Sequence, residues 1–187
     1  MSSTAGLQIE RILLAPRWGG TIDDDWHPWL AAQVPGIERI PLPDPGAPVP
    51  TTCGERFAAA LDAGDPARTL LVGHSVSCQG WLHAVARGSI RVAGLLAIAG
   101  WWTVDRPWPT IRPWCDAVLD HAALRDRLGR VHVVLGTDDP FTSDQHANAQ
   151  RWRDQLGATV EIVDRGRHFN QRQEPAVLAA LRALLAT

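Results

Sequence analysis

The chain has 187 residues, of which 45% are hydrophobic and 20% are charged, the composition of an ordinary globular domain. This length is enough for one full hydrophobic core, so we expect a single domain over residues 1–187. A formal net charge of −2 argues against nucleic acid or an anionic membrane as a partner, and the lack of any lysine excludes Schiff-base, Walker-A and serine–lysine chemistry.

The cysteines and the N-terminus bear on the compartment. Cys53, Cys78 and Cys115 are odd in number and share no CxxC spacing, which predicts reduced thiols rather than disulfides or a zinc site. Residues 1–16 have no basic segment followed by an apolar run, so we expect no signal peptide. No stretch approaches the ~18 apolar residues that span a bilayer. We therefore expect a cytoplasmic protein.

Short apolar runs alternate with amphipathic ones along the chain. The apolar runs predict strands at 11–15, 37–40, 69–73, 92–100, 131–136 and 159–164. The amphipathic stretches predict helices at 26–34, 52–63, 76–88, 115–128, 142–157 and 174–186. This alternation indicates an α/β fold with a mostly parallel sheet of about six strands and helices on both faces.

Ligands of such sheets bind at the carboxyl ends of the strands, so the residues that follow each strand are the candidates for function. Ser75 follows the third strand, Asp138 and Asp139 follow the fifth, and His168 follows the sixth. The order serine, aspartate, histidine is that of the α/β-hydrolase triad. The serine stands in "GHSVS" (73–77), which matches the G-x-S-x-G elbow except at its last position.

These residue types suit nucleophilic catalysis. A serine hydroxyl is a poor nucleophile and needs a base; histidine supplies one near neutral pH, and a carboxylate fixes its tautomer. The triad carboxylate is Asp138 or Asp139, and the other aspartate is then a turn residue that accepts hydrogen bonds from nearby backbone N–H groups. Two backbone amides must bind the oxyanion, and we expect them from Val76 and Trp18.

Several motifs together resemble one known group. They are "PRWGG" (16–20) followed by "DDDWHPWL", "LPDP" (42–45), "VGHS" (72–75), "GTDDPF" (136–141) and "HF" (168–169). On these the chain resembles the small serine hydrolases related to retinoblastoma-binding protein 9, a compact α/β-hydrolase group. The resemblance runs nearly end to end.

That resemblance implies a single-domain α/β-hydrolase fold with the nucleophile at Ser75, the base at His168 and the acid at Asp139, the aspartate before proline. The sequence departs from the group's pattern at two positions. Ser77 replaces the last glycine of the elbow, and Arg167 replaces the glycine before the histidine, where it could crowd the loop or contact an anionic substrate group.

Nine tryptophans and no tyrosine are present, and four of the tryptophans fall in the proline-rich stretch 101–114 after the fourth strand. Since that stretch leaves the functional edge of the sheet, we expect Trp101 or Trp102 to line the substrate site. The alternative is that these rings only pack in the core.

The other polar residues are assigned structural roles. His74 is expected to point away from Ser75, and the acidic run 23–25 is expected to cap a helix rather than to bind a cation. We expect no metal and no cofactor, and no protein partner is indicated.

The sequence therefore predicts a serine hydrolase of the carboxylesterase kind that cleaves a small or medium ester with an apolar portion, through an acyl-enzyme on Ser75. Amide or peptide cleavage is a weaker alternative. A different class also stays open: a weakly active or inactive protein-interaction module on a hydrolase scaffold, which Ser77 and Arg167 would favour.

Overall fold

The structure is a computed structural model that describes residues 9–186. Residues 1–8, which belong to the N-terminal stretch where no signal peptide is expected, lie outside the described residues. Six strands form one sheet in the order β2-β1-β3-β4-β5-β6, and every neighbouring pair is parallel. The strands are β1 (Arg11–Ala15), β2 (Ile37–Arg39), β3 (Thr69–His74), β4 (Val92–Ile98), β5 (Leu128–Gly136) and β6 (Thr159–Val163). The expected number of strands and their parallel direction are confirmed.

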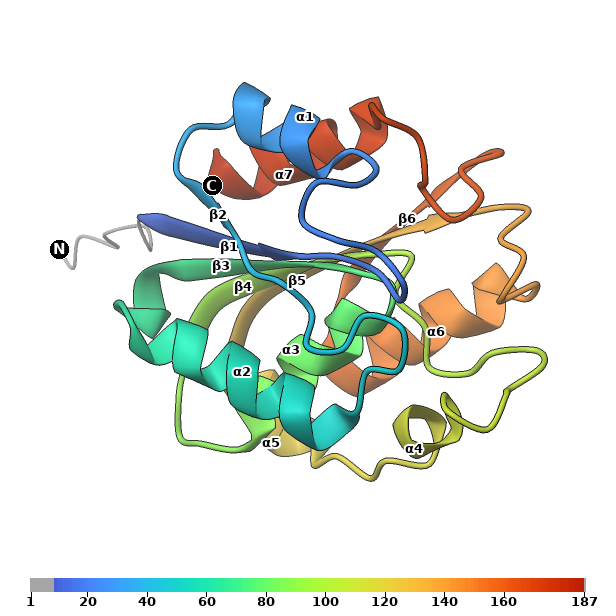
Figure 1. Cartoon of the computed structure of the whole chain (residues 1–187), viewed down its shortest axis with the longest axis horizontal. Coiled ribbons are helices and arrows are strands. Elements are labelled where there is room, and N and C mark those ends of the chain that lie inside the picture. Colours follow the sequence, from blue (N-terminus) through green and yellow to red (C-terminus); the bar gives the residue numbers. More distant parts are fainter. Residues whose placement is uncertain (1–8, 187) are drawn as a thin grey trace, which may run out of the picture.

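Helices cover both faces of this sheet, as expected (Figure 1). They are α1 (His27–Gln33), α2 (Pro50–Asp62), α3 (Val76–Ala86), α4 (Arg112–Cys115), α5 (His121–Arg127), α6 (Gln145–Leu156) and α7 (Pro175–Leu185), with a 3₁₀ turn, η1 (Pro66–Arg68). Helices α1 and α7 lie on one face, and the other helices lie on the opposite face (Figure 1).

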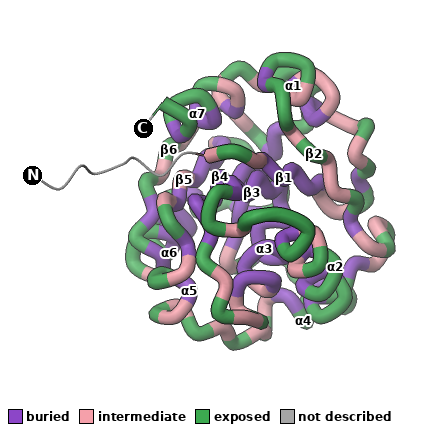
Figure 2. The backbone as a smooth tube through the Cα atoms, turned by 90° about the vertical axis from the view of Figure 1, so that its left-hand side faces the viewer, coloured by how far each residue is buried: buried purple, intermediate pink, exposed green. Residues whose placement is uncertain are grey.

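The hydrophobic core is divided by the sheet into two parts. Because side chains alternate along a strand, Leu13 and Leu71 enter the part under α2 and α3, while Ile12 and Leu70 enter the part under α1 and α7. The central strands are buried along their length, and the outer surfaces of the helices are exposed (Figure 2). Burial on both faces explains why the third, fourth and fifth strands are almost continuously apolar.

The sheet order brings two loops together. From β1 the chain crosses to β2 on one side, and it then returns to place β3 on the other side of β1. The loops that follow β1 and β3 therefore leave neighbouring strands at the point where the direction of winding reverses, which is where open α/β sheets bind ligands.

The helix expected over 115–128 is wrong: two short helices stand there, separated by residues 116–120. Helix α4 begins earlier because Pro113 suits the first turn of a helix, where its missing N–H costs nothing. Helix α5 has its own start, since the Asp120 side chain accepts a hydrogen bond from the Ala123 N–H at 3.0 Å.

Candidate active site

Ser75 lies on a sharp turn between the end of β3 and the start of α3. Its backbone angles are φ 56° and ψ −118°, a region that residues with a side chain rarely adopt. The turn is held by a hydrogen bond of 2.8 Å from the Ser75 N–H to the Ile98 carbonyl at the end of β4. Gly73 is required here, because a Cβ at that position would lie 2.7 Å from the backbone nitrogen of Cys78. This is the strained strand–turn–helix elbow that the sequence predicted.

The loops after β5 and β6 bring a carboxylate and an imidazole together. The Nδ1 atom of His168 lies 2.8 Å from Oδ2 of Asp139, and both residues are buried. The other oxygen of Asp139 accepts a hydrogen bond from the Phe141 N–H at 2.9 Å. Because a carboxylate can only accept, the proton of this pair stands on Nδ1, and the lone pair of the neutral ring is on Nε2. Asp138, with φ 60°, is a left-handed turn residue beside them.

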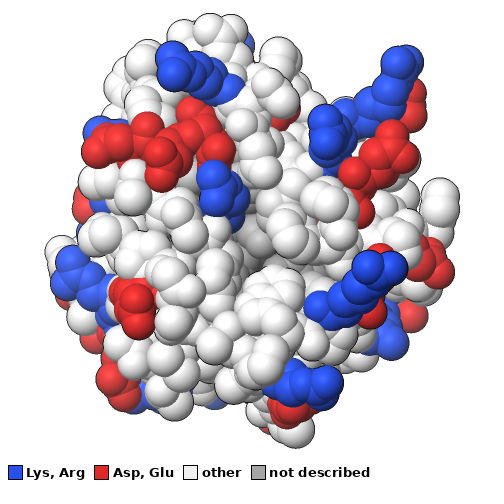
Figure 3. All heavy atoms as spheres, turned by 45° about the vertical axis from the view of Figure 1, so that its right-hand side comes forward, with Lys and Arg blue, Asp and Glu red and all other residues white. Residues whose placement is uncertain are grey.

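Ser75 and His168 both line one cavity, whose volume is about 80 Å³. Its walls are mainly apolar, with Trp101, Val104 and Ile111 among them. The carboxyl ends of the strands point to the right in Figure 1, and this side comes forward in Figure 3, where mostly uncharged atoms surround a hollow. The nucleophile and base expected from the sequence thus open on a common, largely apolar space.

The backbone amides of Trp18 and Val76 lie beside the cavity, and neither has a hydrogen-bond partner among the described residues. Val76 is the first residue of α3, where an N–H has no acceptor within the helix. Trp18 stands in the turn after β1, in which Gly20 N–H donates to the Arg17 carbonyl at 3.0 Å and Gly19 N–H donates to the Pro45 carbonyl at 2.7 Å. The cavity therefore has unpaired donors from the two loops that the sheet order brings together.

Comparison with known proteins agrees with this geometry. The family described as serine hydrolase matches residues 12–186. The chain belongs to the serine hydrolase family. A comparison with curated proteins gives no match.

Solved structures similar to this serine hydrolase include the ydeN gene product from B. subtilis, with a TM-score of 0.81 and 17% identity over 95% of this chain and 99% of that chain. A putative ydeN-like hydrolase from Pectobacterium atrosepticum has a TM-score of 0.67 and 18% identity, over 93% of this chain and 91% of that one. A carboxylesterase from the thaumarchaeon Nitrososphaera gargenis has a TM-score of 0.70 and 11% identity, over 100% and 97%. At such identities the likeness shows the fold alone, which is the α/β-hydrolase fold expected from the sequence.

The two expected tryptophans lie in different surroundings in this serine hydrolase. Trp101 lines the cavity beside Ser75. Trp102 does not: its ring packs against Trp152 and His121, with ring centres 4.9 and 5.0 Å apart, and it lines a separate hollow. The expectation for Trp102 is therefore corrected. Consecutive residues that leave a strand point in different directions, and only one of the two rings can turn toward the elbow.

Both departures from the expected motifs have a structural account. Arg167 takes φ 51°, the left-handed conformation that a glycine would adopt at lower cost, and its N–H donates to the Thr137 carbonyl at 2.8 Å. It lines a hollow on the outer side of the histidine loop, apart from the cavity with Ser75. Ser77 is fully buried, and its hydroxyl donates to the Pro16 carbonyl in the loop after β1.

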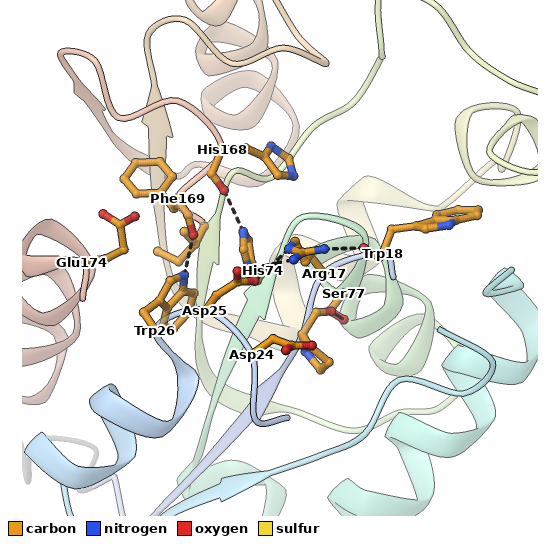
Figure 4. A network of polar contacts seen from close by, with 12 residues as sticks. Arg17, Trp18, Asp24, Asp25, Trp26, His74, Ser77, His168, Phe169 and Glu174 are labelled. Carbon is orange, nitrogen blue, oxygen red and sulfur yellow. Dashed lines mark hydrogen bonds and ion pairs between the residues drawn. The ribbon is translucent and has the colours of Figure 1, made fainter. Parts of the chain in front are cut away.

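A buried polar network behind the elbow was missed by the sequence reasoning (Figure 4). His74 is completely buried, and its Nε2–H donates to the carbonyl of His168 at 2.8 Å. Its Nδ1 lies 3.9 Å from a carboxylate oxygen of Asp25, which in turn accepts from the Arg17 guanidinium at 2.7 Å. Burial is the main reason that the pKa of His74 is well below its usual value, so the ring is neutral.

The acidic run 23–25 does not cap helix α1 as expected. The residue at the start of that helix is Trp26, which has no side-chain capping bond, and its indole N–H instead donates to the Phe169 carbonyl at 2.9 Å. The Asp25 carboxylate accepts a hydrogen bond from the Arg17 guanidinium instead, and the Asp24 carboxylate accepts one from the Thr21 N–H at 2.7 Å. One feature of the sequence could have indicated this arrangement: Trp26, a large aromatic residue of the kind that is usually buried, directly follows the three aspartates 23–25.

Within residues 9–186, no group of three or more His, Cys, Asp and Glu side chains is arranged to hold a metal ion. No helix in that same range combines the length and the apolar character needed to cross a bilayer.

Burial raises the pKa of the Cys78 thiol far above its ordinary value, so this neighbour of the elbow is an inert thiol.

Proposed function

We propose that this serine hydrolase cleaves a small or medium ester with an apolar portion, through an acyl-enzyme on Ser75. The observation that carries the proposal is the 2.8 Å contact between His168 Nδ1 and Asp139 Oδ2, made by a histidine that lines the same cavity as Ser75. The contact leaves the basic lone pair on Nε2, where a general base for the serine hydroxyl needs it.

The proposed reaction begins as Oγ of Ser75 attacks the ester carbonyl carbon and its proton passes to Nε2 of His168. The carbonyl electron pair moves to oxygen, and the amides of Trp18 and Val76 bind this oxyanion. When the C–O bond breaks, His168 gives the proton to the leaving alcohol. Water then attacks the acyl carbon as His168 accepts its proton; the bond from the acyl carbon to Ser75 Oγ breaks, His168 returns the proton to Oγ, and the carboxylic acid leaves. Asp139 keeps Nδ1 protonated and stabilises the imidazolium throughout.

The size and lining of the cavity support the substrate class. Its volume of about 80 Å³ is smaller than the ~150 Å³ of an engineered cavity that holds benzene, which suits an acyl group of a few carbons. Trp101, Val104 and Ile111 offer that group apolar walls. Phe141, 40% exposed, lines the cavity too and gives a leaving group an apolar surface near solvent.

A cavity filled by Trp18, Arg167 or the tryptophan-rich stretch 101–114 would support the interaction-module alternative. The open space beside Ser75 favours the enzyme instead. The motifs that this chain shares with the group related to retinoblastoma-binding protein 9 support a place within that group, and we propose this finer relationship together with the activity.

The direct test is labelling with a fluorophosphonate, which reacts with activated serines. We expect one adduct, located on Ser75 by mass spectrometry, and none in Ser75→Ala. Hydrolysis of a short aryl ester should fall by about 10³-fold or more in that variant. An adduct on Ser77 or Ser143, or no adduct at all, would contradict the proposal.

A further inference from the structure

Ser77 stands where the elbow motif ends in glycine in its usual form. Its side chain has no exposed surface, so its hydroxyl must be satisfied inside the protein. It donates to the carbonyl of Pro16, the residue that follows β1. Among the described residues, this is the one hydrogen bond between helix α3 and the turn at 16–20.

The carbonyl that Ser77 holds lies two residues before Trp18, whose amide we assign to the oxyanion. The later part of the turn is held from elsewhere. The Trp18 indole N–H donates to Gly46 at 3.1 Å, and the Arg17 guanidinium donates to the Trp18 carbonyl at 3.0 Å. Those contacts fix the turn to its own surroundings. Beyond the pairing of β1 with β3, the bond from Ser77 is the one hydrogen bond among the described residues that joins the turn to the elbow helix.

We propose that Ser77 is a positioning residue of the hydrolysis: by holding the Pro16 carbonyl, its hydroxyl sets the distance between the Trp18 amide and Ser75. The inference rests on the proposed function, because it assumes that Trp18 supplies an oxyanion donor. Such a donor contributes only when it is already in place as charge develops on the carbonyl oxygen.

One buried hydrogen bond can affect the rate because of where the two oxyanion donors lie. The two oxyanion donors come from separate segments: Val76 belongs to the elbow helix, whereas Trp18 belongs to the turn after β1. A shift of one segment by about 1 Å is enough to lower a rate strongly. Ser77 lies one residue after Val76 and donates to the neighbouring segment, so it couples the two donors directly.

The test compares the full-length wild type with Ser77→Ala and Ser77→Gly. Glycine restores the usual elbow residue but has no hydroxyl. Complete loss of an oxyanion donor costs about 10²–10³ in kcat, so a misplaced donor should cost about 10- to 100-fold. We expect this loss in kcat for a short aryl ester, with KM little changed. The inhibition constant of a trifluoromethyl ketone, which forms an oxyanion on Ser75, should rise by the same factor.

Thr69→Val is the matched control. Thr69 is a fully buried residue at the far end of β3, and its hydroxyl donates to the Asp65 carbonyl at 2.7 Å. This variant also loses a hydroxyl-to-carbonyl bond, so it should lower the midpoint of thermal unfolding about as much as Ser77→Ala, with kcat unchanged.

The outcomes separate the two proposals. If Ser77→Gly keeps the wild-type kcat/KM, or if the loss appears only in KM, the role of Ser77 is overturned while the proposed function stands. If the wild type neither hydrolyses esters nor reacts with a fluorophosphonate at Ser75, the proposed function and this role fall together. An equal loss of kcat in Thr69→Val would mean that Ser77 acts through stability alone, which also overturns the role.

Discussion

Two adjacent aspartates, Asp138 and Asp139, have different surroundings although both directly follow β5 and its first loop residue. Asp139 is buried and contacts His168, whereas Asp138 takes the left-handed φ of 60°. Left-handed backbone is tolerated by aspartate and asparagine better than by most residues. This makes asparagine a suitable substitute at both positions, because it fits the turn at Asp138 and keeps the size of Asp139.

We predict that Asp139→Asn lowers kcat for ester hydrolysis by about 10³- to 10⁴-fold, because an amide favours the wrong tautomer of His168. Asp138→Asn should change kcat by less than about threefold, as expected for a turn residue without a direct contact to the site. Steady-state kinetics of both variants on one aryl ester checks this. A larger loss at Asp138 would reverse the assignment.

At the scale of single residues, the sequence predicted what chain order and strand ends can reveal. Ser75 and His168 each follow a strand, so a parallel sheet must bring them to one edge. The orientation of Trp101 and Trp102 could not be predicted, because it depends on how the chain leaves β4 and on which neighbours, such as Trp152, offer a packing surface.

Among the elements, the segment between β4 and α4 decides the shape of the cavity. Its sequence restricts φ at two positions, Pro107 and Pro109, which lowers the entropy lost when the segment is fixed in one conformation. Its start is also tied to the helices: Gln79 of α3 donates to the Trp101 carbonyl, and Asn148 of α6 donates to the Gly100 carbonyl at 2.9 Å.

This segment predicts a difference between its two tryptophans. Trp101→Leu enlarges the apolar cavity, so the ratio of kcat/KM for a longer-chain ester to that for a short-chain ester should rise by about tenfold. Trp102→Leu is the control, because its ring packs away from the cavity; it should lower the thermal midpoint and leave the ratio unchanged. The measurement is kcat/KM across a series of aryl esters. An unchanged ratio for Trp101→Leu would mean that this ring only packs.

The elements themselves were predictable to different degrees. Strands β3 and β4 were evident as apolar runs bounded by glycine or by a turn. The helix expected over 115–128 failed because its periodicity joined two short helices, and the break between them depends on the cap at Asp120 and on the early start favoured by Pro113. Boundaries of this kind are local competitions between small free energies, which a hydrophobic pattern does not resolve.

For the whole molecule, two buried histidines link stability to pH. His27 and His74 are 1% and 0% exposed, and His27 has no hydrogen bond to either ring nitrogen among the described residues. Burial is the main cause that lowers the pKa of His27 to about 4, and it also lowers the pKa of His74. The negative charge of Asp25 raises the pKa of His27 and so opposes burial, whereas the positive charge of Arg17 lowers it further.

The sign of the effect follows from proton uptake. Between pH 6.5 and about 4 the unfolded chain protonates His27 and the folded protein does not, so the stability present above pH 6.5 is lost as the pH falls. For His27 this amounts to about 3 kcal/mol across the interval. We predict that His27→Phe, which keeps an aromatic ring, makes the free energy of unfolding less steep in pH by about one proton. Urea denaturation at a series of pH values from 7.0 to 4.5 measures the slope, and equal slopes would contradict the prediction.

The all-parallel sheet also determines how the chain must reach its native state. No neighbouring pair of strands can form from a hairpin, because each pair is joined by a crossover. Strand β1 pairs with β3 through Arg11 and Thr69, after the intervening chain has already supplied β2 and α2. Contacts so distant in sequence make folding slow, since loop entropy is lost before the pairing compensates for it. Newly synthesised chains therefore expose the apolar strand β3 until β1 and β4 flank it, and during that interval they depend on dilution or on a chaperone to avoid association with one another.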